Sequence, residues 1–122
     1  MMFPPLFAIA SVDTSVTALL GDSPVRFFPF GEAEANPVLP YAVWQTVFGT
    51  PENYLGDLPD TDRFGIQLDV YAHEASEARE IAQVLRDVFE PHAYVTSYNG
   101  ESRDPVTRNY RYSLTVDWIV HR

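Results

Sequence analysis

The chain has 122 residues, of which 46% are hydrophobic, and it contains 8 Phe, 7 Tyr and 2 Trp. This length predicts one domain spanning residues 1–122, with no room for a second. The composition is sufficient to fill one buried core and argues against intrinsic disorder. The absence of cysteine excludes disulfides, thiolate catalysis and cysteine-ligated metal centres.

The formal net charge of −9 is distributed unevenly along the chain. Residues 1–62 hold eight carboxylates and one base, Arg26, whereas residues 63–122 hold nine carboxylates and seven arginines. A protein that binds DNA without sequence preference needs a basic face, so this charge balance argues against that class. The ordinary interpretation is a solubilising acidic surface. A more specific alternative is an acidic surface that DNA passes without binding to it.

We expect no secretory signal in the N-terminal residues, because the first basic residue is Arg26 and prolines interrupt the apolar start. No apolar run approaches the roughly 20 residues that span a bilayer. We therefore expect a soluble protein that is made in a cytoplasm and does not contact a membrane.

The N-terminal segment, residues 1–20, is predicted to be helical from Pro4 to Leu20, since proline is favourable in a first helical turn. An open alternative is a break near Ser11, with a restart capped by Ser11 or Asp13. Beyond the helix we expect a short strand over residues 25–30 and a polar loop over residues 32–37.

Alternating apolar and polar residues predict the main strands of a sheet with one buried face. These strands are expected over residues 41–48, 64–72 and 110–120. A further strand is expected over residues 93–98, with Asn99-Gly100 marking the turn that follows it.

The apolar residues between 76 and 89 recur at helical spacing, which predicts an amphipathic helix that ends before Pro91. Together these segments predict an α+β fold: a mostly antiparallel sheet with two helices packed on one face. The expected core residues are Trp44, Ile66, Leu68, Val70, Ile81, Leu85, Leu114, Val116 and Trp118.

The sequence shows no pattern typical of a catalytic, cofactor or metal site. The three histidines lack the spacings of metal ligands, and there is no nucleophile elbow or glycine-rich phosphate loop. Asp57, Asp60 and Asp62 could supply oxygen ligands to calcium, but their spacing is not that of an EF-hand and fits ordinary turns. We predict that the protein is not an enzyme and has no cofactor and no metal.

Two long connections, residues 49–63 and 97–109, are predicted to protrude as loops that contact a partner. Aromatic and aliphatic side chains within a polar rim are typical of interfaces. Two alternatives stay open: Tyr54 and Leu55 could fold back over the core, and residues 97–109 could be a plain mobile hairpin. The candidate interface residues are Tyr54, Leu55, Asp57, Asp60, Asp62, Asn99, Glu101, Arg103, Asp104 and Arg108.

Several of these segments occur together in a known family. They are Pro40-Tyr-Ala-Val-Trp44, Pro51-Glu-Asn-Tyr-Leu-Gly56 with Asp62-Arg63, Ile66-Gln-Leu-Asp-Val-Tyr-Ala72, Glu77-Ala-Arg-Glu-Ile81, Ser102-Arg-Asp-Pro105, Tyr110-Arg-Tyr112 and Asp117-Trp118. In their order along the chain they resemble the tail-completion, or tail-terminator, proteins of long-tailed bacteriophages. The resemblance runs from about Val25 to the C-terminus, and the N-terminal helix matches only in pattern.

The resemblance implies a tail-terminator-like structural protein that forms a ring, expected to be a homohexamer, on the head-proximal end of the tail tube. The ring would end tube polymerisation and provide the docking surface for the head connector. Its partners would be further copies of itself, the major tail tube protein and a connector, adaptor or stopper protein of the head. DNA would pass through the ring without specific binding, and assembly would take place in the host cytoplasm. Two alternatives stay open: another neck or head–tail joining component, and a bacterial small-molecule-binding domain.

Overall fold

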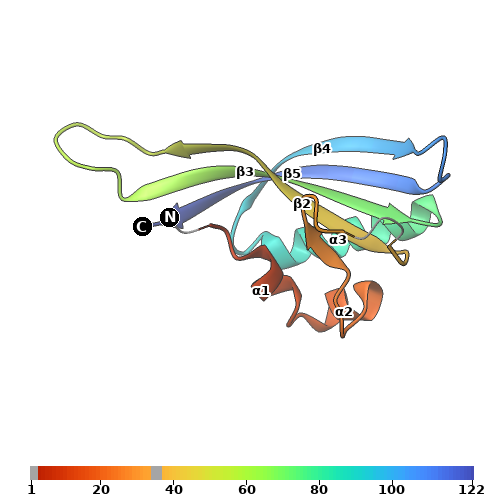
Figure 1. Ribbon diagram of the computed structural model, residues 1–122. Helices are drawn as coiled ribbons and strands as arrows, with labels where there is room; N and C mark the ends of the chain where they lie inside the picture. The colour runs from red at the N-terminus through yellow and green to blue at the C-terminus, as the bar shows by residue number, and fades with distance from the viewer. Residues whose placement is uncertain (1–2, 34–36) are drawn as a thin grey trace.

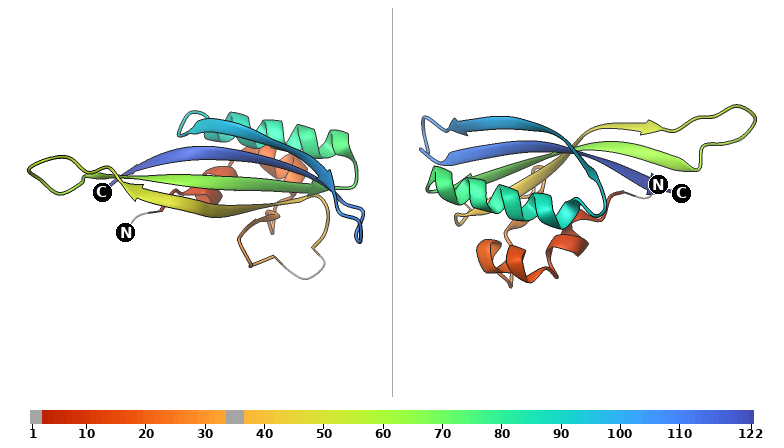
Figure 2. Two further views of the ribbon diagram at one scale, coloured as in Figure 1. Left: turned by 90° about the horizontal axis from the view of Figure 1, so that it is seen from above. Right: turned by 180° about the vertical axis from the view of Figure 1, so that it is seen from behind.

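The computed structural model describes residues 3–33 and 37–122. It shows a five-stranded sheet with helices on one side (Figures 1 and 2). The elements in chain order are α1 (Leu6–Ala10), α2 (Thr14–Leu20), β1 (Phe27–Pro29), β2 (Tyr41–Pro51), β3 (Thr61–Ala72), α3 (Ala75–Phe89), β4 (Tyr94–Arg103) and β5 (Tyr110–His121).

The sheet has the strand order β1-β2-β3-β5-β4. All neighbouring strands are antiparallel except β1, which runs parallel to β2. The predicted α+β class with a mostly antiparallel sheet is therefore confirmed. Helix α3 lies across one face of the sheet, and α1 and α2 pack on the same side (Figure 1).

The N-terminal helical segment is broken, as the alternative interpretation allowed. Helix α1 ends at Ala10, and α2 restarts at Thr14 with Asp13 as its N-cap. The Asp13 Oδ1 atom accepts hydrogen bonds from the backbone N–H groups of Ser15 and Val16, at 2.9 and 3.1 Å. These bonds satisfy two of the amides that a new helix leaves without partners, and so they favour the restart at this point.

The core lies between the sheet and α3, where alternate residues of β3 and β5 point inward. Phe89 of α3 links two parts of this core. Its ring centroid lies 5.7 Å from Trp118 of β5 and 6.1 Å from Phe27 of β1. Eight of the nine expected core residues are buried, and the ninth, Trp44, is half-buried and packs against the core beside Phe27.

Both predicted loops are shorter than expected because the strands extend into them. Strands β2 and β3 remain paired out to Pro51 and Asp62, which leaves residues 52–60 as the connection. The prediction of a turn at Asn99-Gly100 is wrong, because β4 continues to Arg103. Gly100 instead lies at a β-bulge within the strand. Its φ of +102° is a conformation that glycine adopts readily because it has no side chain. The chain reverses over residues 104–109. Part of the predicted polar loop, residues 34–36, lies outside the described residues.

Replacing Trp118 by alanine should destabilise the protein by about 3–5 kcal/mol, because the change removes a buried indole and leaves a cavity beside Phe89. Urea unfolding of the two proteins measures the difference. The neighbouring Ile119 is exposed on the other face of the sheet, so Ile119→Ala is the matched control and should cost less than about 1 kcal/mol. Equal effects of the two changes would contradict this assignment of faces.

Candidate subunit interface

The two hairpins of the sheet protrude at opposite ends of the molecule (Figure 1). The β2–β3 hairpin extends well beyond the helices, and we call residues 49–63 the arm. The β4–β5 hairpin ends in a compact reversal at the other end, and we call residues 103–109 the β4–β5 tip. Together they hold eight of the ten predicted interface residues; the other two, Asn99 and Glu101, lie further along β4.

The end of the arm is an ordered turn that presents apolar side chains to solvent. Tyr54 and Asp57 form a β-bridge across it, and Gly56 has a φ of +88°, a conformation that disfavours residues with a side chain. Leu55 is fully exposed at 101%, Leu58 is 78% exposed, and Tyr54 is about half exposed at 49%. Tyr54 and Leu55 therefore do not fold back over the core.

A close contact between two residues shapes the base of the arm. A β-bulge between Thr46 and Phe48 turns the Phe48 ring toward Gly65 on the adjacent strand. A Cβ atom at position 65 would lie 2.1 Å from that ring, so only glycine leaves enough room. The Arg63 guanidinium lies 5.5 Å from the centroid of the same ring and contacts the carboxylates of Glu52 and Asp117, each at 3.7 Å.

Asp62, one of the candidate interface residues, is buried at the base of the arm. The guanidinium of Arg122 donates to both of its carboxylate oxygens, with 2.9 Å between Nη2 and Oδ1. The backbone N–H of Arg122 also donates to the carbonyl of Asp60, at 2.8 Å. The hydrogen bonds from Arg122 hold the pKa of Asp62 below its usual range. Asp62 therefore fixes the arm to the end of β5, and it is Asp57 and Asp60 that face outward.

The β4–β5 tip is shaped by Asp104 and carries two arginines. The Asp104 carboxylate accepts hydrogen bonds from the N–H groups of Val106 and Thr107, at 2.8 and 2.9 Å, and these bonds hold its pKa below the usual range. Arg103 lies over the Tyr110 ring, 4.8 Å from its centroid, and its Nε donates to the Arg108 carbonyl at 3.2 Å. Arg108 has a φ of +64°, in the left-handed region that residues other than glycine seldom occupy.

Asn99 and Glu101 lie within β4, outside the β4–β5 tip, and their side chains make hydrogen bonds to other residues of the same chain. The Asn99 Nδ2 atom donates to the hydroxyls of Ser113 and Thr115, at 3.1 and 2.9 Å, on the face of the sheet without helices. Glu101 accepts two hydrogen bonds from Arg79 of α3, at 2.6 and 2.9 Å, which lower the pKa of Glu101. The ion pair therefore links β4 to the helix layer.

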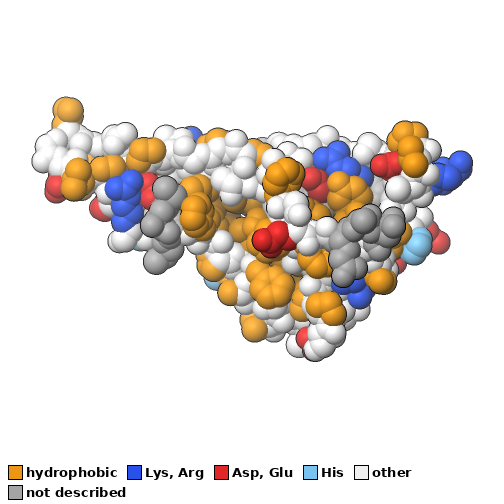
Figure 3. All heavy atoms as spheres, viewed as in Figure 1, with side chains coloured by type: hydrophobic (Ala, Val, Ile, Leu, Met, Phe, Trp, Pro, Cys, Tyr) orange, Lys and Arg blue, Asp and Glu red, His pale blue; other side chains and the backbone are white. Residues whose placement is uncertain are grey.

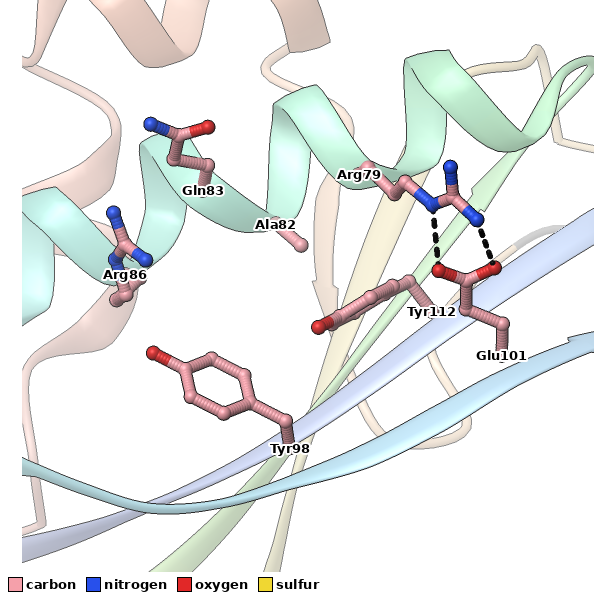
Figure 4. A pocket seen from close by; sticks show the side chains of 7 residues that line it. All are labelled: Arg79, Ala82, Gln83, Arg86, Tyr98, Glu101 and Tyr112. Carbon is pink, nitrogen blue, oxygen red and sulfur yellow. Dashed lines mark hydrogen bonds and ion pairs between the residues drawn. The ribbon is translucent and has the colours of Figure 1, made fainter.

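A shallow hollow of about 360 Å³ lies between α3 and β4 (Figure 4). Its lining includes Arg79, Arg86, Tyr98, Glu101 and Tyr112. Both arginines already form ion pairs. Arg79 pairs with Glu101, and Arg86 pairs with Asp87 at 3.1 Å and with Glu90 at 3.6 Å. The hollow therefore does not present an uncompensated positive charge to a bound anion. The sequence did not reveal it, because the pairing of β4 with β5 is what brings Tyr98 beside the helix.

In residues 3–33 and 37–122, no group of three histidine, aspartate or glutamate side chains is placed to hold a metal ion. Asp57, Asp60 and Asp62 do not converge, since the Asp57 carboxylate accepts from the Leu58 N–H at 2.8 Å and Asp62 faces Arg122. Over the same ranges, no helix is long and apolar enough to cross a membrane.

Acidification should loosen the base of the arm before the rest of the sheet. Asp62 has a lowered pKa in the folded protein, so its pairing contributes stability above the unfolded aspartate pKa of about 3.9 and loses it as the pH falls through the lower, folded value. We expect hydrogen-exchange protection of the Arg122 and Glu52 amides to fall between about pH 5 and pH 2, relative to Leu68 at the centre of β3. In Asp62→Asn this pH dependence should be absent. Protection that falls equally in both proteins would contradict the role of Asp62.

The chain matches the family described as "Tail completion protein gp17" over residues 4–121, nearly its whole length. No curated protein matches the sequence. Among solved structures, a chain of the virion of a native gene transfer agent particle has a similar fold, with a TM-score of 0.71, 12% sequence identity, and coverage of 96% of this chain and 92% of that one. At this identity the structural match speaks to the fold alone, whereas the family match covers the elements that build the core, the arm and the β4–β5 tip. The chain therefore belongs to the tail completion protein family and is a structural protein of a phage tail.

Proposed function

We propose that this protein, acting as one domain over residues 1–122, forms a ring that caps the head-proximal end of the tail tube. The ring ends polymerisation of the tube and offers its free side to the head connector. The observation that carries the proposal is that a member of the tail completion family presents hairpins with exposed apolar side chains at both ends of one sheet.

The shape of the molecule favours assembly through unlike surfaces. The arm and the β4–β5 tip lie at opposite ends and differ in length, composition and charge. A contact between unlike surfaces repeats from copy to copy, and it closes into a ring when the rotation at each step divides a full turn. A cap that must stop further growth of a tube requires such closure. Six copies is the number that the family resemblance implies.

The acidic charge suits a ring through which DNA passes. Outside the arm, exposed carboxylates include Asp22 and Glu32 in the N-terminal half and Glu80 and Asp87 on α3. Carboxylates on the inner wall would repel phosphates and prevent the genome from adhering during ejection. This part of the proposal is contradicted if the carboxylates of the N-terminal half all map to the outer wall of the assembled ring.

Electron microscopy of particles from a phage that lacks this gene tests the assignment. Overlong tails that do not join filled heads are expected, because a missing cap leaves the tube free to grow and removes the docking surface. Tails of normal length beside unattached full heads would instead assign the protein to head–tail joining. Intact, infectious particles would contradict any role at the neck of the particle.

Replacing Tyr54 and Leu55 together by serine should leave the monomer folded and abolish its ability to complement the deletion. Both side chains are exposed, so their loss removes contact area without opening the core. Thermal unfolding checks the fold, and the yield of infectious particles checks the function. Val12→Ser is the control, because Val12 is 81% exposed but lies between α1 and α2, away from the arm. A double mutant that complements normally would exclude the arm from the interface.

A further inference from the structure

We infer that the arm of one copy docks against the β4–β5 tip of the next copy, so that neighbouring subunits join head to tail. The inference rests on the proposed ring and identifies which surfaces hold it together. Each surface therefore binds a second copy of this chain. The arm contacts the β4–β5 tip of one neighbour, and the β4–β5 tip contacts the arm of the other neighbour.

The positions of the two surfaces prevent them from meeting within one molecule. The arm and the β4–β5 tip are separated by the length of the sheet and point away from each other (Figures 1 and 2). In the space-filling view, hydrophobic and acidic side chains lie along the end formed by the arm, with arginine side chains at its base, and the opposite end carries arginine side chains beside hydrophobic and acidic ones (Figure 3). Contact between the surfaces therefore requires two copies.

The charges of the two surfaces are complementary. Glu52, Asp57 and Asp60 make the connection between β2 and β3 acidic. Of the three carboxylates only that of Glu52 is in an ion pair among the described residues, with Arg63 at 3.7 Å, although Arg122 lies close to Asp60. At the other end, Arg103 and Arg108 form no ion pair with a carboxylate of residues 3–33 or 37–122. The Asp104 carboxylate is directed at the amides of its own turn, so it shapes the β4–β5 tip without closing off the guanidinium groups.

Each charged surface also has an apolar centre. Leu55 and Leu58 protrude from the arm, and Val106, 88% exposed, protrudes from the β4–β5 tip between the two arginines. A small apolar contact surrounded by opposite charges has the composition of an interface core and its rim. On both surfaces the backbone is held by internal hydrogen bonds, so docking requires little ordering of either segment.

The backbone of Arg108 supports the same assignment. Its left-handed conformation would be adopted at lower cost by glycine or asparagine, so the turn alone does not favour arginine there. Within the described residues, the guanidinium of Arg108 makes no hydrogen bond that would compensate. A carboxylate from a neighbouring copy supplies the missing partner.

The absence of native cysteine allows a clean cross-linking test. Three variants are compared under mild oxidation, free in solution and in lysates of the deletion phage complemented with each gene: Leu55→Cys, Val106→Cys and the double variant. Head-to-tail docking predicts a ladder of cross-linked multimers from the double variant, dimers from a mixture of the two single variants, and monomers from each single variant alone. Homodimers of Leu55→Cys alone, or no cross-link from the double variant in either setting, would overturn the inference.

Charge reversal tests the electrostatic pairing in the double-cysteine background. Asp57→Arg with Asp60→Arg, or Arg103→Glu with Arg108→Glu, should each reduce cross-linking at least tenfold. An equimolar mixture of the two reversed proteins should restore it, because each basic surface then meets an acidic one. Glu80→Arg, on the exposed face of α3, is the control for net charge and should retain the ladder. No restoration in the mixture would overturn the pairing, and restoration also shows that the reversed proteins are folded.

These results separate the interface from the proposed function. If the deletion phage makes overlong tails but the double-cysteine variant forms no cross-link, the proposed cap function is supported and this interface is wrong. If the double-cysteine variant forms cross-links but the deletion phage makes tails of normal length, this interface is supported and the proposed cap function is wrong.

Discussion

The structure depends on the uninterrupted pairing of β3 with β5. Their register runs from Thr61 opposite His121 to Ala72 opposite Tyr110, without a bulge, and it places the inward residues of both strands under α3. The two outer partners are irregular in comparison: β2 has one bulge and β4 has two. A central pair with continuous register, flanked by strands with bulges, gives one molecule both a regular central axis and two hairpins directed away from the core.

The two hairpins are stabilised by different interactions. The arm is fixed at its base by long-range contacts, in which Gly65 admits the Phe48 ring and Arg122 holds Asp62. The β4–β5 tip is fixed locally, by hydrogen bonds from its own amides to Asp104. The arm therefore keeps its direction through the tertiary fold, and the β4–β5 tip keeps its shape through its own sequence. An assembly that has to repeat the same angle at every step benefits from both kinds of rigidity.

Much of the fold could be predicted from the sequence, because one buried face imposes a period of two on β3 and β5 and of 3.6 on α3. The strand ends could not. The extension of β2 to Pro51 depends on its pairing with β3, and Asn99-Gly100 is equally compatible with a turn or a bulge. Among the candidate site residues, the exposure of Leu55 follows from a local turn, but the burial of Asp62 depends on Arg122, sixty residues away in the chain. Contacts of that range have no local signature.

The same ion pair has a consequence for how the protein can be handled. Because Arg122 is held beside Asp60 and Asp62, and the Phe3 ring lies 5.7 Å from that of Phe64, both ends of the described chain lie next to the base of the arm (Figure 1). An affinity tag or fluorescent protein fused after Arg122 is therefore placed beside the arm, where its bulk can obstruct a neighbouring subunit. The exposed connection between α1 and α2, around Val12, is a more suitable site for a label, because it lies in the helix layer and away from both hairpins.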